Sequence, residues 1–289
     1  MKVLLIGKNG QVGWELRRCF APIADVVAVD FPMIDLERPD SVRQWTREVR
    51  PDLVLNAAAY TAVDDAEREP DRATAINGIA PGVLAEEAQR IGAWLVHYST
   101  DYVYDGTKRE PYLETDPVGP LSAYGKSKLA GEQAVQAVGG KYLIFRLCWV
   151  YGLRGSNFLL TIQRLARQRE TLRVVNDQIG CPTWSRLVAE GTALAVRQAF
   201  DCKEPSLLAG VYHLASSTWT SWHSFAEAIV GSMPSGERKC QRVDAIPTTQ
   251  YPRPARRPAW SVLSCAKLER VFGIRLPGWE EGLRLALGE

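Results

Sequence analysis

A glycine-rich loop directly follows the first apolar run of the chain, and this arrangement constrains the fold most. The apolar run covers residues 3–6, and the loop at residues 7–13 has the pattern G-x-x-G-x-x-G, through Gly7, Gly10 and Gly13. A stretch with apolar residues at helical spacing comes next. In a strand–turn–helix unit, such glycines let a pyrophosphate approach the backbone at the positive end of the helix. The loop favours a dinucleotide-binding unit over a plain structural turn.

Apolar runs without polar alternation recur along the first half of the chain, separated by helical patterns. The runs lie at residues 26–29, 53–55, 94–96 and 142–147, and the clearest helical pattern covers residues 79–91. Continuous apolar runs are typical of strands that are buried on both faces. Strands that alternate with helices form a parallel sheet with helices on both sides. The pattern predicts an α/β fold with a Rossmann-like, doubly wound parallel sheet.

The length of the chain, and the loss of the regular strand–helix alternation after about residue 151, indicate the domain organisation. At about 150 residues per domain, 289 residues make about two domains. We expect a dinucleotide-binding domain at 1–150 and a smaller, mainly nucleotide-sugar-binding lobe at 151–289. Later segments, about 172–215, are expected to return to the first domain. Four prolines predict an extended or looped segment at 247–258, with short helices after it.

The charge balance argues against nucleic-acid and membrane partners. The 35 basic residues exceed the 33 acidic ones by only two, whereas a phosphate-tracking surface needs a clear basic excess. The N-terminal apolar run is too short for a signal peptide, and no run approaches the ~18 apolar residues of a membrane span. The six cysteines include no C-x-x-C pair, which favours free thiols in a reducing compartment. We therefore expect a cytoplasmic protein.

An acidic residue stands where a dinucleotide-binding unit needs one. Asp30 ends the second apolar run, about 20 positions after the loop, where a carboxylate binds the ribose hydroxyls. A carboxylate at this place repels a 2′-phosphate, which favours NADH. Asp35 and Leu36 follow and are candidates for the adenine pocket. A turn or helix-cap aspartate is the alternative for Asp30, and a simple turn explains the other two equally well.

A tyrosine and a lysine stand four residues apart on a predicted helix. Tyr124 and Lys128 share one helix face, Ser122 is a suitable N-cap, and the helical pattern runs through Ala134. An ammonium beside a phenol favours the ionised phenol and lowers its pKa. This predicts a proton-transfer pair. An isolated Y-x-x-x-K match, however, is common by chance, and an exposed tyrosine with a solvated lysine is then the simpler interpretation.

Residues at the ends of two strands support the catalytic interpretation. Thr100 ends the strand predicted from 94–96, at the carboxyl edge of the sheet where such folds bind ligands. Its hydroxyl can donate a hydrogen bond to a substrate carbonyl oxygen. Small residues at 57–59, after the third run, let a cofactor pack against the backbone. The alternative for Thr100 is an ordinary β-branched strand residue. The alternative for residues 57–59 is tight packing between helix and sheet.

Together, these residues resemble the extended short-chain dehydrogenase/reductases and, within them, the dTDP-4-dehydrorhamnose reductase family. The narrower resemblance spans nearly the whole chain and rests on residues 7–16, 56–64, 97–104, 146–151, 176–178 and 254–258. It implies reduction of the C4 ketone of a dTDP-sugar, dTDP-4-dehydrorhamnose, to dTDP-L-rhamnose with NADPH or NADH. The preference between the two cofactors and the formation of a homodimer stay open.

The resemblance implies a role for each candidate residue. Tyr124 would donate the proton, Thr100 would hydrogen-bond the same oxygen, and Lys128 would hold the ribose hydroxyls and tune Tyr124. With the residues singled out above, the cofactor-binding candidates are Gly7, Gly10, Gln11, Val12, Gly13, Asp30, Asp35, Leu36, Ala58, Ala59, Tyr60, Thr61, Tyr98, Tyr124 and Lys128. The substrate-binding candidates are Val63, Thr100, Asp101, Tyr102, Trp149, Arg256 and Arg257. No metal site is expected, because Arg186 stands where a carboxylate partner of Glu15 would be required.

Other functions on the same fold are the alternatives. One alternative is a nucleotide-sugar 4,6-dehydratase. The sequence pattern of that family has an Asp-Glu pair directly after the threonine, whereas here Tyr102 follows Asp101. Another nucleotide-sugar reductase or epimerase would use the same machinery. A regulatory subunit of methionine adenosyltransferase resembles the same reductases but acts as a binding partner. Measuring catalytic turnover would distinguish such a binding protein from an enzyme.

Overall fold

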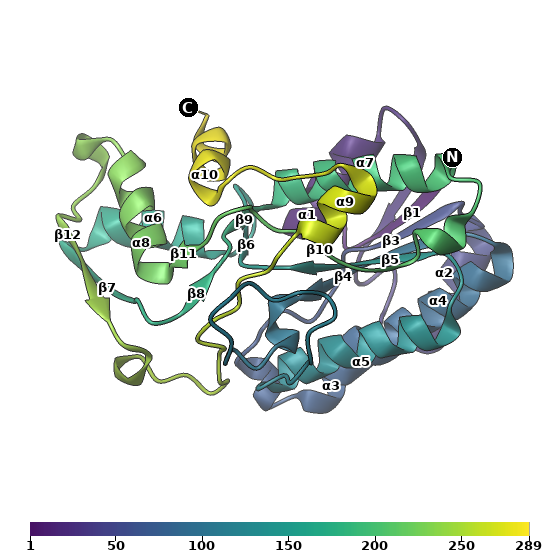
Figure 1. Ribbon diagram of the computed structural model, residues 1–289, viewed down its shortest axis with the longest axis horizontal. Helices are drawn as coiled ribbons and strands as arrows, with labels where there is room; N and C mark the ends of the chain where they lie inside the picture. Colours follow the sequence, from purple (N-terminus) through teal and green to yellow (C-terminus); the bar gives the residue numbers. More distant parts are fainter. Residues whose placement is uncertain (289) are drawn as a thin grey trace.

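One parallel sheet forms the centre of the computed structural model, which describes residues 1–288 (Figure 1). The strands lie in the order β10-β5-β4-β3-β1-β2, and every neighbouring pair is parallel. Their bounds are β1 Lys2–Ile6, β2 Asp25–Val29, β3 Leu53–Asn56, β4 Trp94–Thr100, β5 Tyr142–Leu147 and β10 Gly210–His213. The predicted Rossmann-like fold is confirmed.

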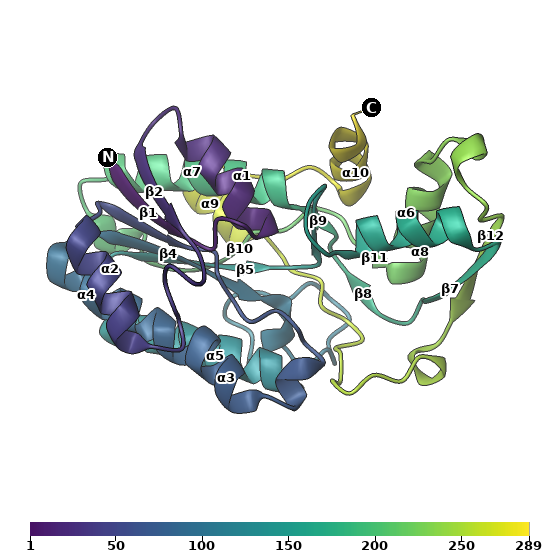
Figure 2. The same cartoon turned by 180° about the vertical axis from the view of Figure 1, so that it is seen from behind.

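The apolar runs are continuous because both faces of the sheet are covered by helices. Val3 and Leu5 of β1 belong to one buried core, and Leu4 and Ile6 belong to the other. The first core is closed by α1 (Gln11–Phe20), α7 (Ser185–Asp201) and α9 (Ala266–Phe272). The second is closed by α2 (Pro39–Val49), α4 (Ala80–Ile91) and α5 (Ala123–Val138). Figures 1 and 2 show these two helical layers on opposite sides of the sheet.

The predicted helices begin and end at recognisable residues. Helix α5 begins after Ser122, whose Oγ accepts a hydrogen bond from the Gly125 N–H at 3.1 Å, and ends before Gly139 at φ 76°. Helix α4 ends at Gly92, whose φ of 73° suits a residue without a Cβ. It follows α3 (Pro70–Thr74) and the π-helical turn η2 (Ala75–Ile79). The helix predicted over 79–91 and the N-cap predicted at Ser122 are therefore confirmed.

A smaller unit, here called the small lobe, lies beside one end of the sheet (left in Figure 1). It consists of α6 (Phe158–Gln168), β7 (Thr171–Val175), α8 (Trp222–Ser232) and β12 (Arg242–Ile246), around a core of its own. Strand β7 pairs with β12 and not with the central sheet. The expected return of residues 172–215 to the sheet is therefore wrong for β7, while α7 and β10 do lie there. Residues 171–175 of β7 instead pair in parallel register with residues 242–246 of β12.

Short elements connect the two units. Strand β6 (Val150–Tyr151) pairs with β9 (Thr183–Trp184), and β8 (Ile179–Gly180) pairs with β11 (Thr220–Ser221). The remaining elements are η1 Asp65–Glu67, η3 Asp101–Val103, η4 Pro205–Leu207, η5 Ser235–Glu237, η6 Thr248–Gln250 and α10 Trp279–Leu287. The proline-rich segment is a loop except at η6, as predicted. Over residues 1–288, no helix is long and apolar enough to cross a membrane.

The strand order creates a crevice between β1 and β3. The chain leaves β1 toward β2 on one side, and it leaves β3 toward β4 on the other. The connections therefore diverge at the carboxyl ends of β1 and β3, which is where open α/β sheets bind their ligands. The glycine loop follows β1, and residues 57–61 follow β3, so both line this crevice.

Candidate functional site

The crevice opens into a cavity of about 630 Å³, here called the switch-point cavity. Its wall brings together most of the residues that the sequence singled out. Those lining it are Gly7, Gly10, Gln11, Val12, Asp30, Ala58, Ala59, Thr61, Val63, Tyr98, Thr100, Asp101, Tyr102, Tyr124, Lys128 and Trp149. The sequence reasoning missed Asn9, Ser99, Gly155, Ser156, Asn157 and Trp222, which also line it.

The glycine loop is fixed by close backbone contacts. Gly7 has φ 88°, and a Cβ there would lie 2.6 Å from the backbone nitrogen of Ala58. Gly13 does not line the cavity, but a Cβ on it would overlap the carbonyl oxygen of Gly7. The first turn of α1 carries no capping side chain and no acidic residue. The free N–H groups of this turn can donate hydrogen bonds to an anion.

Asp30 joins the glycine loop to the end of β2. Its carboxylate accepts hydrogen bonds from the backbone N–H groups of Asn9 and Phe31, both at 2.9 Å. The residue lines the cavity, as predicted for a ribose ligand. The same carboxylate also holds the loop in place, so the structural and the functional interpretation of Asp30 are compatible.

Besides Gly13, three predicted cofactor contacts lie outside the cavity. The Asp35 carboxylate accepts the Glu37 N–H at 3.0 Å within a turn, as the simpler interpretation had it. Leu36 is buried in the core beneath β1 and β2, since an apolar side chain at this place packs inward. The Tyr60 hydroxyl donates to Glu69 at 3.1 Å, which turns the phenol away from the crevice. The structure therefore does not bring these side chains to the cofactor.

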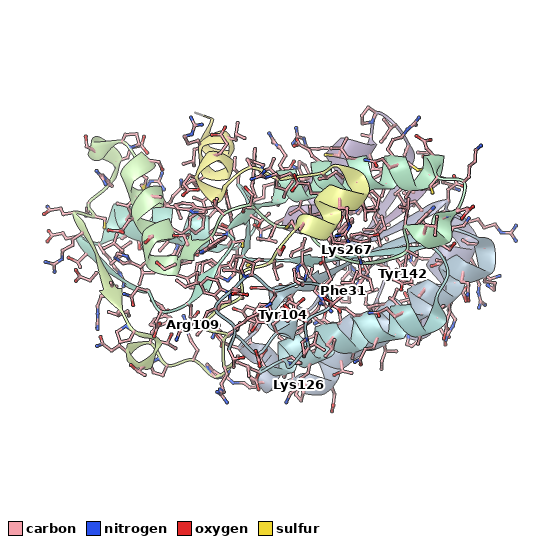
Figure 3. All side chains as sticks on the ribbon, in the orientation of Figure 1. Phe31, Tyr104, Arg109, Lys126, Tyr142 and Lys267 are labelled. Carbon is pink, nitrogen blue, oxygen red and sulfur yellow. The ribbon has the colours of Figure 1, made fainter. Side chains whose placement is uncertain are left out.

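Tyr124 and Lys128 face the cavity from α5, one turn apart. Lys128 is only 2% exposed, whereas Lys126 of the same helix is exposed and lies on the outer side of α5 in Figure 3. The Lys128 ammonium donates to the backbone oxygen of Tyr98 at 2.5 Å. Burial lowers the pKa of Lys128 to about 8, although the nearby Glu132 carboxylate acts in the opposite direction.

The expected lowering of the tyrosine pKa is not found. Burial raises the pKa of Tyr124 to about 12, and the hydrogen bond with Thr100 only partly offsets it. The reason is that the Lys128 ammonium is directed to Tyr98 and His97 instead of the phenol. At neutral pH the phenol therefore keeps its proton, as a proton donor must.

A histidine that the sequence reasoning missed lies behind Lys128. His97 is 1% exposed, and its Nε2 lies 3.5 Å from the Lys128 ammonium. Its Nδ1 lies 3.2 Å from Nδ2 of Asn56 at the end of β3. Burial and the Lys128 charge hold the pKa of His97 well below its usual range, so the imidazole is neutral. Only its place among apolar neighbours in a central strand could have marked it.

Thr100 and Asp101 lie at the carboxyl end of β4, beside Tyr124. The two side-chain oxygens, Thr100 Oγ1 and Asp101 Oδ1, are 3.1 Å apart. Oδ2 of Asp101 accepts a hydrogen bond from the Cys148 thiol at 3.2 Å. Burial raises the pKa of Asp101 to about 6, against the effect of hydrogen bonds from Ser261, Cys148 and Thr100. No local sequence pattern marks Cys148 or Ser261 as part of this cluster.

A second cavity of about 620 Å³, here called the arginine cavity, lies in the small lobe. Five arginines line it: Arg169, Arg173, Arg253, Arg256 and Arg257. Arg257 pairs with Asp64 through two hydrogen bonds, at 3.1 and 3.0 Å. Arg256 is exposed and makes no ion pair within residues 1–288. The two arginines that the sequence grouped together thus differ, because only Arg256 offers an uncompensated charge.

A tryptophan pair lies between the two cavities. The indoles of Trp149 and Trp222 stack with their centroids 3.5 Å apart and their planes at 6°. Trp222 lines both cavities. Trp149 has φ 46°, a left-handed conformation that is rare for a bulky residue and occurs at functional sites. This stack marks the path between the cofactor side and the arginines.

Glu15, considered above as a metal ligand, lies on α1 in an ion pair. Its carboxylate is 3.3 Å from Nε of Arg186 and 2.6 Å from Nη1 of Arg18. Within residues 1–288, no group of three His, Cys, Asp or Glu side chains is arranged to hold a metal ion. The two guanidinium groups compensate the charge of Glu15.

Comparison with known proteins places this geometry in a family. The family model described as RmlD substrate binding domain matches residues 1–289. The dTDP-4-dehydrorhamnose reductase of Burkholderia thailandensis is 49% identical over 292 residues, which cover 99% of this chain and 98% of the relative.

Two solved structures agree along their whole length. The dTDP-4-dehydrorhamnose reductase of Clostridium acetobutylicum superposes with a TM-score of 0.91 at 38% identity, covering 100% of this chain and 99% of the other. The Bacillus anthracis reductase, solved in complex with NADP, has a TM-score of 0.89 at 35% identity, with 99% and 98% covered. From these end-to-end matches, this chain belongs to the dTDP-4-dehydrorhamnose reductase family.

Proposed function

We propose that this protein reduces the C4 ketone of dTDP-4-dehydrorhamnose with NADPH or NADH, forming dTDP-L-rhamnose. This is the last step of dTDP-rhamnose biosynthesis. The observation that carries the proposal is the meeting of Thr100, Tyr124 and Lys128 beside the glycine loop in one cavity. Trp222 connects that cavity to the arginine cavity, which suits a substrate with a sugar at one end and a nucleotide at the other.

The switch-point cavity fits a nicotinamide dinucleotide. The open first turn of α1 suits the pyrophosphate, which Gly7, Gly10, Gln11 and Val12 would hold. Ser99 lines the cavity, and its hydroxyl is buried without a hydrogen-bond partner among residues 1–288. When bound, the reduced cofactor supplies a hydride. NADPH and NADH both remain in the proposal.

Two side chains would handle the proton, and a third would hold the cofactor. Tyr124 donates it to the ketone oxygen as that oxygen gains negative charge, since burial keeps the phenol protonated at neutral pH. Thr100 donates a hydrogen bond to the same oxygen, which stabilises the charge of the transition state. Lys128 would hold the cofactor ribose from the wall of the switch-point cavity.

The substrate would extend across both cavities. Val63, Asp101, Tyr102 and Trp149 line the part of the switch-point cavity that suits the sugar. Arg256 would bind the pyrophosphate, because a guanidinium makes strong paired hydrogen bonds with phosphate. The remaining cofactor contacts in the proposal are Asp30, Ala58, Ala59, Thr61 and Tyr98.

Two alternatives are less well supported. Dehydration would need a second carboxylate beside Asp101, where Tyr102 stands with its ring edge-on to Tyr124. A regulatory role in the manner of a methionine adenosyltransferase subunit would not need Lys128 to be buried beneath Tyr124. Turnover with a keto-sugar distinguishes both from the reductase.

We propose further that residues 1–150 form the dinucleotide-binding domain, with α7 and β10 added to it, and that the small lobe binds the nucleotide sugar. The six cysteines are free thiols, which supports a cytoplasmic location. A homodimer is also proposed, for which light scattering of the purified protein is the direct test.

The experiment that tests the function follows the near-ultraviolet absorbance of reduced nicotinamide with enzymatically generated dTDP-4-dehydrorhamnose. Wild type should oxidise the cofactor, and Tyr124→Phe should lose about 10²–10⁴-fold in kcat while cofactor binding is kept. Tyr142→Phe is the matched control, because this phenol lies at the start of β5 and outside both cavities. A folded wild type that oxidises neither NADPH nor NADH would contradict the proposal.

A further inference from the structure

The Thr100 hydroxyl has a single hydrogen, and in this structure that hydrogen is donated to Asp101. Its Oγ1 accepts the Tyr102 N–H at 3.2 Å, lies 3.1 Å from Asp101 Oδ1, and hydrogen-bonds with the Tyr124 phenol. A hydroxyl has one hydrogen to donate, and an ionised carboxylate can only accept. While Asp101 is ionised, it therefore takes the hydrogen of Thr100, and none is left for a substrate oxygen.

The other side of Asp101 is closed by donors that carry no charge. Asp101 is 2% exposed, and its Oδ2 accepts from the Cys148 thiol at 3.2 Å. Ser261 provides a further hydrogen bond, and both Cys148 and Ser261 are buried. The side chains that hydrogen-bond to Asp101 are thus two hydroxyls and one thiol. A buried carboxyl among neutral donors binds a proton more readily than one in an ion pair.

We propose that a protonated Asp101 is the positioning residue that directs the hydrogen of Thr100 onto the substrate ketone, and that Cys148 sets how readily Asp101 is protonated. In this form Asp101 donates to Thr100 Oγ1, and Thr100 is free to donate its single hydrogen to the ketone oxygen. The inference rests on the proposed reductase function. It assigns Asp101 a role in the chemistry beyond lining the sugar pocket.

The protons and electrons of the proposed reduction balance. C4 of the ketone gains a hydride, with both electrons, from the reduced nicotinamide, and the carbon–oxygen π bond breaks. Its electron pair forms the new O–H bond with the proton of Tyr124. Tyr124 recovers a proton from solvent water after the product leaves, and Thr100 and Asp101 keep their protons throughout, so no further reactant is needed.

The direction of the pH dependence follows from the same groups. Burial raises the pKa of Asp101 to about 6, while hydrogen bonds from Ser261, Cys148 and Thr100 act against it. The titratable neighbours are the Tyr102 and Tyr124 phenols and the Cys148 thiol, and Cys181 and Arg257 lie behind them. The dinucleotide and the dTDP-sugar are both anions, so their binding favours the protonated carboxyl further. Activity should fall as the pH rises through the pKa of Asp101 in the bound complex.

The test uses the pH profile of kcat in Asp101→Asn. The asparagine amide donates to Thr100 at every pH, and its oxygen accepts from Cys148. Wild type should lose about tenfold in kcat per pH unit on its alkaline side, and Asp101→Asn should remove this decline. An alkaline decline that is unchanged in Asp101→Asn overturns the proposal.

Two substitutions of Cys148 test the same idea in opposite directions. Cys148→Ala removes a donor from the carboxylate, so the alkaline decline should move up by about half to one pH unit. Cys148→Ser provides a stronger donor and should move it down. Cys202→Ala is the matched control, since this thiol lies far from the site, after α7. Shifts of both Cys148 variants in the same direction would indicate a packing effect and overturn the role of Cys148.

An infrared titration separates this inference from the reductase function. The infrared band of the protonated Asp101 carboxyl is obtained by subtracting the spectrum of Asp101→Asn from that of wild type. Both proteins are measured with bound dinucleotide and without sugar. Its midpoint should move up in Cys148→Ala and down in Cys148→Ser. If the keto-sugar is not reduced but the band behaves in this way, only the reductase function fails. Absence of the band at acidic pH in folded wild type overturns the protonated Asp101 itself.

Discussion

The two cavities of the molecule have nearly the same volume, about 630 and 620 Å³, but they are built differently. The switch-point cavity is lined by glycine and alanine backbone at the ends of β1 and β3, and by side chains of β4 and α5 such as Tyr98 and Lys128 that the fold holds in place. The arginine cavity is lined by long side chains from α6, β7 and the loop at 248–257. The first is therefore rigid and intolerant of added atoms, whereas the second can adapt through its side chains.

The two cavities also differ in how deeply their cationic side chains are buried. Lys128 is 2% exposed, and its ammonium is directed to one backbone oxygen, whereas Arg256 is exposed. A buried cation is costly and has one geometry, but an exposed one is hydrated and mobile. The comparison indicates that chemistry is placed where the fold is rigid and that substrate charge is recognised where it is not.

The largest effect is expected from adding one carbon behind the glycine loop that forms a wall of the rigid cavity. Gly13→Ala would drive a methyl group into the carbonyl oxygen of Gly7, which belongs to the backbone and cannot turn aside. We expect the affinity for NADPH and NADH to fall about a hundredfold, or about 2.7 kcal/mol. Fluorescence titration of the dinucleotide measures it, with circular dichroism to confirm the fold.

Gly231→Ala is the matched control for this substitution. Gly231 lies in α8 of the small lobe, and a Cβ there meets no atom within 4 Å. Its dinucleotide affinity should equal that of wild type. Full affinity in a folded Gly13→Ala protein would show that the glycine loop is not as rigid as its contacts indicate.

An intermediate effect is expected in the adaptable cavity. Arg256→Met removes an exposed guanidinium that lines the cavity and has no ion-pair partner within residues 1–288. The KM for the dTDP-sugar should rise about tenfold, since hydrogen bonds to charged groups contribute about 1.5–3 kcal/mol and neighbouring arginines replace part of them. The dinucleotide affinity should not change.

Arg164→Met, on the exposed side of α6 and outside the cavity, is the comparison variant. Steady-state kinetics with varied sugar and saturating cofactor separate the two. If both variants raise the KM equally, the effect comes from net charge and not from the arginine cavity.

The smallest effect concerns stability. The pKa of Lys128 falls to about 8 through burial, despite the opposing charge of Glu132, so the unfolded chain binds more protons than the folded one between about pH 8 and its ordinary value. The cost of the buried charge is therefore full below pH 8 and declines as the pH rises. Lys128→Met should be about 1 kcal/mol more stable than wild type at neutral pH, and the difference should shrink at alkaline pH.

Urea unfolding at several pH values measures this difference. Lys126→Met, on the exposed side of the same helix, should show neither the gain nor its pH dependence. If Lys128→Met is less stable than wild type at neutral pH, the hydrogen bond to Tyr98 outweighs the desolvation of the ammonium.

The sequence predicts the rigid cavity well because its parts are local. An apolar strand, a glycine pattern and a tyrosine–lysine spacing on one helix each carry their own geometry, and the switch point brings them together. Ser122 and the strand at 142–147 could be assigned for the same reason. Asp35 and Leu36 lie outside the cavity, in a turn and in the core, and the local sequence pattern of such positions does not differ from that of a binding loop.

The other contacts depend on segments that are far apart in the chain. Cys148 and Ser261 are 113 positions apart, and Asp64 and Arg257 are 193 apart. No periodicity or motif indicates that they meet, because tertiary packing selects them. The direction of the Lys128 ammonium could not be predicted either, since spacing along a helix defines a shared face but not a hydrogen-bond acceptor.

The tryptophan pair gives the protein a spectroscopic property of its own. Two indoles at 3.5 Å with nearly parallel planes have strongly coupled electronic transitions, and a chiral environment converts such coupling into a circular dichroism signal in the ultraviolet. Because Trp222 lines both cavities, a sugar that passes between them would disturb the pair and its signal. Substrate arrival could then be followed in unlabelled protein, separately from the absorbance of the nicotinamide.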